Sequence, residues 1–136
     1  MTLNNDDELL KIREKIVSDI MSTNVDADGT VKILNGNIIN DFITKNKFAI
    51  IDFYATWCPP CKIMDPITKE MAQDYKGKVA FGKINTDNDQ QAAIQYQIRY
   101  VPTFYLFKDG KIVFYFSGAK RKKDFMDIIK KYFKVE

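Results

Sequence analysis

Histidine is absent from this chain of 136 residues, and its absence excludes several kinds of site. A Cys–His pair, a Ser–His–Asp triad and every metal site with a histidine ligand need the missing imidazole. A general base in this protein must therefore be a carboxylate, a lysine or a thiolate.

Cysteine is scarce, since Cys58 and Cys61 are the two cysteines of the chain. A structural zinc site usually takes about four ligands, so two cysteines supply only part of one. A metal ion shared between two chains remains an alternative, but we expect no metal site within one chain.

Long apolar runs are missing as well. The charged start, MTLNNDDELLKIREKIV, lacks the apolar stretch of a secretory signal, and no window is long and apolar enough for a transmembrane helix. We therefore expect a cytoplasmic protein that does not bind a membrane. In that compartment a CxxC pair is more typical of redox chemistry or metal binding than of a structural disulfide.

Charge of one sign is not in large excess, because the net charge is +3. Most of that excess lies in the C-terminal stretch KRKKDFMDIIKKYFK, for which nucleic-acid binding is an alternative. Its apolar residues recur at helical spacing, so we favour a docked amphipathic helix with a basic solvent face and expect no nucleic-acid partner. These apolar residues are Phe125, Ile128, Ile129, Tyr132 and Phe133.

The hydrophobic periodicity alternates between helical and strand spacing along the chain. It predicts helices at residues 7–21, 35–47, 58–75, 87–96 and 121–134. It predicts strands at residues 31–34, 48–54, 79–84, 103–107 and 111–116. In the helix at 35–47 the residues expected to face inward are Ile38, Ile39, Phe42 and Ile43. This alternation predicts an α/β fold, with a mixed sheet of four to five strands and helices on both faces, over residues 31–136. Residues 1–30 form an N-terminal helical extension in this interpretation.

The stretch IIDFYATWCPPCK holds both cysteines at the end of a predicted strand and the start of a helix. Pro59 and Pro60 then fall in the first helical turn, where proline loses little because the first N–H groups have no partner within the helix. Cys58 lies near the positive end of the helix dipole, which favours its thiolate. We expect Cys58 to attack a disulfide, and Cys61, one turn later, to resolve the mixed intermediate.

Asp52 is the second unusual residue, because it lies in the strand AIIDFYA, which is apolar on both faces. Burial disfavours the charged form of a carboxyl group and raises its pKa. We expect Asp52 to accept the proton of Cys61 when that thiol acts. An Asp bonded to backbone at a strand end is the alternative.

The segments DFYATWCPPCK, KIN, RYVPTFYLFKDGK and SGA resemble the thioredoxin family over roughly residues 31–135. The resemblance implies the thioredoxin fold and a protein disulfide reductase in which Cys58 attacks, Cys61 resolves and Asp52 is the buried acid–base. It implies that Lys83, on the neighbouring strand, tunes Asp52. It also implies a cis peptide bond before Pro102.

The resemblance further implies a groove for the substrate chain. Val101 would pair with that chain, and Trp57, Pro59, Pro60, Pro102 and Gly118 would line the groove. The implied partners are thioredoxin reductase and disulfide-containing client proteins, in electron transport and cell redox homeostasis. No cofactor is expected, because the cysteine pair itself carries the electrons, and we expect a monomer.

The chain departs from the family in three places. Pro59 replaces the usual glycine, Tyr100 stands where smaller residues are common, and the leader before residue 30 is extra. Pro59 removes an N–H donor from Cys58, which favours the disulfide, whereas altered turn geometry could strain the disulfide. We expect a redox potential in the reducing range.

Three alternatives remain. The motif WCPPC also occurs in dedicated thioredoxin-like reductants of cytochrome maturation, although those carry an exported leader or a membrane anchor. The stretch NVDADGTVKILN resembles part of an EF-hand calcium loop, but Asn35 stands where a glutamate is needed, so an Asp-Gly turn is favoured. The leader helix could dock a partner or a second copy, although packing on its own domain is the simpler expectation.

Overall fold

The structure is a computed structural model, and it describes residues 7–13 and 24–136. Residues 7–13 are helical, and the rest of the helix predicted at 7–21 lies outside the described residues. Leu9, Leu10 and Ile12 on this helix are exposed, so the structure gives no support to packing of its apolar side chains on the domain. Within the described residues, no helix has both the length and the apolar character needed to cross a membrane.

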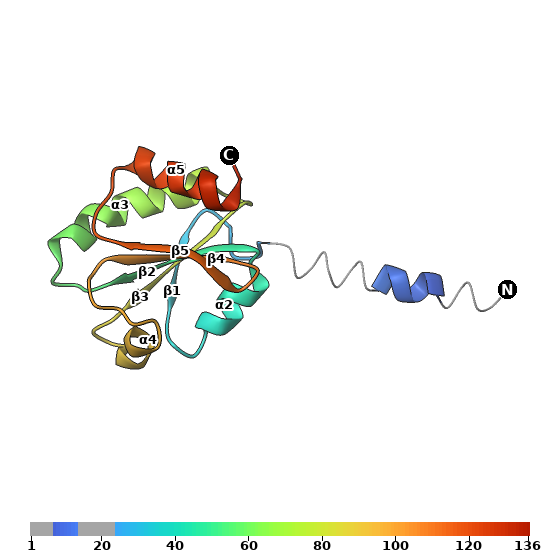
Figure 1. The fold of residues 1–136 in the computed structure, drawn as a ribbon, viewed down its shortest axis with the longest axis horizontal. Coiled ribbons are helices and arrows are strands. Elements are labelled where there is room, and N and C mark those ends of the chain that lie inside the picture. The colour runs from blue at the N-terminus through green and yellow to red at the C-terminus, as the bar shows by residue number, and fades with distance from the viewer. Residues whose placement is uncertain (1–6, 14–23) are drawn as a thin grey trace.

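A five-stranded mixed sheet forms the centre of the domain (Figure 1). The strand order is β1-β3-β2-β4-β5; β1, β3 and β2 run parallel, β4 is antiparallel to β2, and β5 is antiparallel to β4. The predicted α/β class and mixed sheet are confirmed. The strands are β1 (Val31–Leu34), β2 (Phe48–Tyr54), β3 (Ala80–Asn85), β4 (Thr103–Lys108) and β5 (Lys111–Ser117).

Helices cover both faces of the sheet. In Figure 1, α3 and α5 lie together along one face, and α2 and α4 lie on the other side. Helix α3 continues through Pro66, which lies in its interior. The bounds are α2 (Ile39–Lys45), α3 (Pro59–Asp74), α4 (Gln90–Gln95) and α5 (Lys122–Phe133).

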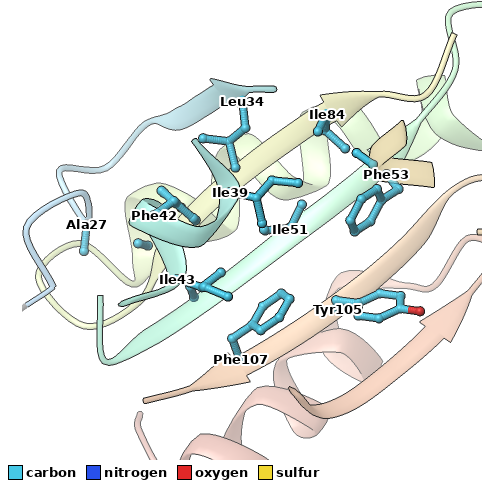
Figure 2. Close-up of a cluster of buried hydrophobic side chains, with 13 residues drawn as sticks. Ala27, Leu34, Ile39, Phe42, Ile43, Ile51, Phe53, Ile84, Tyr105 and Phe107 are labelled. Atoms are coloured by element: carbon cyan, nitrogen blue, oxygen red, sulfur yellow. The ribbon is translucent and has the colours of Figure 1, made fainter. Parts of the chain in front are cut away.

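The core below α2 follows from the alternation of side chains along β2. Ile51 and Phe53 point to this face and pack with Ile39 and Phe42 of α2 and Phe107 of β4 (Figure 2). Each of these side chains is at least nine-tenths buried. The same alternation therefore sends Ile50 and Asp52, the residues between them, to the opposite face.

The core below α3 and α5 occupies that opposite face. Ile50 packs there with Met64 of α3 and with Phe125 and Ile129 of α5. Phe133 is buried as well, whereas Ile128 and Tyr132 are partly buried. The C-terminal stretch is therefore a docked amphipathic helix, with its lysines on the outer side, as the periodicity predicted.

Helix α2 differs from the prediction at its start. It begins at Ile39 rather than at residue 35, and Ile38 is 41% exposed rather than inward. The residues before it form a turn, because the Asn35 side chain accepts the N–H of Asn37 and the Asp89 side chain accepts the N–H of Gly36. The Asn35 bond is local, and bonds of this kind compete with helix formation, whereas the Asp89 bond comes from a residue 53 positions away.

Residues 24–30, which the sequence pattern assigned to the extension, contact the sheet domain. Ala27 is buried in the α2-side core, and Asp26 exchanges hydrogen bonds with the buried side chain of Asn46. Asp28 binds Thr30 and Lys32 within an Asp-Gly turn, and strand β1 follows it. An EF-hand needs a helix at that point, so the turn interpretation is supported.

Candidate active site

Cys58 and Cys61 form a disulfide at the N-terminus of α3, with their Cα atoms 5.2 Å apart. Cys58 is the N-cap residue, and its Sγ accepts the N–H of Cys61 at 3.2 Å. Pro59 and Pro60 occupy the first turn of the helix, as the sequence predicted. The strand-to-helix connection therefore places the Cys58 sulfur at the positive end of the helix dipole.

The proline loop before β4 lies directly against the disulfide. The Val101–Pro102 peptide bond is cis, as the resemblance implied, and the Cys58 Sγ lies 3.4 Å from the Val101 carbonyl oxygen. Val101 and Ala55 pack on the two cysteines, which are both buried. The sulfur atoms are therefore enclosed by this loop on one side and by the start of α3 on the other.

The rim of the site contains the other residues that the sequence singled out. Trp57 is 68% exposed, and its Nε1–H donates to Asp87 at 3.2 Å. The Gly118 N–H donates to the Pro102 carbonyl at 2.8 Å, with Gly118 at a φ of +94° that few other residues adopt. Pro59 and Pro60 are also exposed beside Trp57. Segments far apart in the sequence thus meet around one disulfide.

Asp52 lies behind the disulfide on β2, facing α3. Its side chain is 5% exposed, and its Oδ1 has no hydrogen-bond partner. Asp52 and Cys61 line the same cavity of about 270 Å³. Burial, only partly offset by the charge of Lys83, raises the pKa of Asp52 from 3.8 to about 7.

Lys83 stands opposite Asp52 in the parallel register of β2 and β3. Its positive charge lowers the pKa of Asp52, which agrees with a tuning role. Its ammonium group, however, is ion-paired with Asp65 of α3 at 3.3 Å, and it lies over the ring of Tyr54. Lys83, which the resemblance expected to tune Asp52, is therefore ion-paired with a carboxylate that the sequence interpretation did not single out.

Asp65, Asp87 and Tyr54 are the residues of the site that sequence reasoning missed. Asp65 comes four residues after Cys61, so helical spacing places both side chains on the same face of α3 and would have indicated it. Asp87 and Tyr54 carry no such local signal, because their contacts join residues from separate elements.

In residues 7–13 and 24–136, no group of three or more potential metal ligands comes together. The two cysteines are bonded to each other in this structure. They are the oxidised form of a dithiol, the arrangement that thiol–disulfide exchange requires.

Comparison with known proteins supports this chemistry. The family model described as Thioredoxin matches residues 29–131. The chloroplastic thioredoxin M-type of Spinacia oleracea is 38% identical over 103 residues, covering 75% of this chain and 57% of that protein. A thioredoxin of Synechocystis sp. is 35% identical over 103 residues, covering 76% of this chain and 96% of that protein.

The fold agrees with the same family. A mutant thioredoxin from Halobacterium salinarum NRC-1 superimposes with a TM-score of 0.74 at 30% identity, covering 80% of this chain and 96% of that one. The family-model match, over residues 29–131, spans the disulfide, the proline loop and the buried carboxyl group. The chain therefore belongs to the thioredoxin family and is a protein-disulfide oxidoreductase.

Proposed function

We propose that this protein reduces the disulfides of client proteins, with Cys58 as the nucleophile, Cys61 as the resolving thiol and Asp52 as the acid–base. The observation that carries the proposal is the Cys58–Cys61 disulfide at the N-cap of α3, beside a cavity that Cys61 and the buried carboxyl group of Asp52 both line. Thioredoxins are the relatives that match, and nothing among the comparisons favours the cytochrome-maturation alternative.

The first step starts from the reduced protein. The Cys58 thiolate attacks one sulfur of the client disulfide, forms a mixed disulfide and releases the other client sulfur as a thiolate. The helix N-terminus and the N–H of Cys61 stabilise negative charge on the Cys58 sulfur. This stabilisation makes Cys58, rather than Cys61, the attacking group.

The second step frees the client. The Asp52 carboxylate takes the proton of the Cys61 thiol through the shared cavity, and the resulting thiolate attacks the Cys58 sulfur. The bond between Cys58 and the client breaks, and the client leaves with two thiols after protonation. The client gains two electrons and two protons, and the protein ends as the disulfide seen in the structure.

The client chain binds, in this proposal, along the proline loop. Val101 presents its backbone there, while Trp57, Pro59, Pro60, Pro102 and Gly118 form the rim. A groove that reads mainly backbone accepts many sequences, which suits a reductant with several clients. No separate cofactor is needed, because the cysteine pair carries the electrons.

The wider setting follows from the family. A thioredoxin reductase would return the disulfide to the dithiol, and the protein would act as a monomer in the cytoplasm, in electron transport and cell redox homeostasis.

Equilibration with glutathione tests the direction of the reaction, because a reductant has a low midpoint potential. A midpoint well above about −200 mV would instead indicate a protein that makes disulfides.

Trapping with a disulfide client tests the roles of the two cysteines. Cys58→Ser should not react, because the nucleophile is missing. Cys61→Ser should accumulate a covalent protein–client adduct that dithiothreitol releases, because the resolving thiol is missing. Equal trapping by both variants, measured by non-reducing electrophoresis, would show that the roles are assigned wrongly.

A further inference from the structure

Lys83 lies near two carboxyl groups, those of Asp52 and Asp65. The register of the sheet sets it opposite Asp52, and both residues line the cavity behind the disulfide. The ammonium group nevertheless binds Asp65 at 3.3 Å and lies 5.3 Å from the centre of the Tyr54 ring. Asp52 keeps an oxygen without a hydrogen-bond partner. The Lys83 ammonium group is thus paired with Asp65 and not with Asp52, although Asp52 is the buried carboxyl group with an unpaired oxygen.

Asp65 is well placed to hold Lys83 in this position. It lies one helical turn after Cys61 on α3, and its carboxylate bridges two lysines, Lys69 at 3.0 Å and Lys83 at 3.3 Å. The Asp65 side chain is 39% exposed and that of Lys83 is 20% exposed, and both residues line the cavity. Hydrogen bonds from both lysines outweigh the effect of burial and keep the pKa of Asp65 below its usual value.

The charged groups around Asp52 shift its pKa in opposite directions. From β3, Lys83 favours its ionised form; from α3, Asp65 favours its neutral form. Lys62 and Cys61 of α3 also line the cavity. Loss of the charge on Asp65 would remove one repulsion and would also release Lys83 toward Asp52. Both changes favour the ionised form of Asp52.

We propose that Asp65 is a positioning residue for disulfide exchange: it holds Lys83 in an ion pair on the α3 side of the cavity and so keeps Asp52 able to take and return the proton of Cys61. The proposal rests on the acid–base role of Asp52 in the proposed function. Asp65 itself touches neither sulfur in this account. It acts through Lys83, and its effect therefore depends on that lysine.

The titration of the Asp52 carboxyl carbon by NMR tests this dependence in the oxidised protein, where no thiol titrates. Asp65→Asn should move the Asp52 midpoint to lower pH by about half a unit or more. Asp65→Ala, which offers Lys83 no acceptor, should move it at least as far. The pH profile for release of a client from its mixed disulfide with Cys58 should move in the same direction.

Asp74→Asn is the matched control. Asp74 lies on the same helix, is 42% exposed and binds Lys122 at 2.8 Å, but it does not line the cavity. This variant should leave the Asp52 midpoint unchanged. A shift as large as that of Asp65→Asn would mean that a general loss of negative charge, rather than the position of Asp65, is responsible.

A second variant, Lys83→Met, separates the positioning of Lys83 by Asp65 from the simple repulsion between Asp65 and Asp52. In Lys83→Met, the Asp65→Asn substitution can remove only repulsion, so its shift should be smaller than in the wild-type background. Equal or larger shifts there, or no shift in the wild-type background, would overturn the proposal. The trapping of clients by Cys61→Ser does not depend on Asp65. It therefore tests the proposed function separately from the titrations that test the role of Asp65.

Discussion

The burial of Asp52 destabilises the folded protein at neutral pH, but it also gives the carboxyl group a pKa suited to proton transfer. The folded protein binds its proton more tightly than the unfolded chain does, because burial raises its pKa from 3.8 to about 7. Linkage then requires the contribution of Asp52 to stability to be greatest below about pH 4 and to fall as the pH rises toward 7, where the buried group loses its proton. A carboxyl group kept under such a penalty has a pKa matched to proton transfer near neutral pH.

The substitution Asp52→Asn removes that penalty. We expect the oxidised variant to be more stable than wild type at pH 8 by up to about 4 kcal/mol, since one pKa unit corresponds to about 1.4 kcal/mol. The gain should vanish below about pH 4, where the wild-type group is protonated in both states. Guanidinium unfolding across this pH range measures the difference. A stability gain that does not depend on pH would contradict the buried-acid explanation. The same variant should also release clients from Cys58 more slowly.

At the scale of elements, the close approach of α2 to the sheet depends on a residue without a side chain. A Cβ built on Gly82 of β3 would lie 2.5 Å from Leu34 Cδ1 and 3.2 Å from Phe42 Cζ. Both neighbours are buried, so neither can swing into solvent. Gly82 thus leaves room for the Leu34 side chain of the neighbouring strand β1 and for Phe42 of α2, in the sheet that carries Asp52 and Lys83.

Gly82→Ala should therefore overpack this core and destabilise the protein by about 1–3 kcal/mol. Thermal unfolding of the oxidised protein measures the loss. Its cost should shrink in a Leu34→Ala background, where the clashing side chain has been shortened. An unchanged cost in that background would place the clash elsewhere.

The elements that the sequence predicted correctly share a strong local signal. The apolar strand 48–54 and the strand 31–34 have the predicted bounds, because both are short runs rich in β-branched and aromatic residues. The start of α2 was predicted too early, because Asn35 and Asp89 cap backbone groups in ways that periodicity does not reveal. Helical spacing from Cys61 could have placed Asp65 on the cysteine face of α3, but its pairing with Lys83 could not be predicted, because only the fold brings Lys83 to α3.

At the scale of the whole molecule, residues 24–136 contain the sheet, both cores and the disulfide. The chain from residue 24 is tied to the domain, since the Asn24 side chain accepts the N–H of Phe48 and the Ala27 carbonyl accepts that of Gly77. The helical residues 7–13 expose their apolar side chains. The domain therefore has no visible need of the described part of the leader.

Removal of residues 1–13 should leave the unfolding free energy within about 0.5 kcal/mol of the full chain, the range of changes outside the core. The rate of client reduction should also stay the same. Denaturant unfolding and a disulfide-reduction assay measure the two quantities. A loss of more than about 1 kcal/mol would mean that the leader packs on the domain after all.

The central claim is that the Cys58 sulfur is ionised at neutral pH because it caps a helix. Alkylation of the reduced protein with iodoacetamide, followed as a function of pH with mass spectrometry to locate the product, tests it most directly. The account predicts that Cys58 reacts first, with a half-maximal rate at a pH well below the value of about 8.5 for a free cysteine. If neither sulfur reacts below that pH, or if Cys61 reacts first, the account is contradicted.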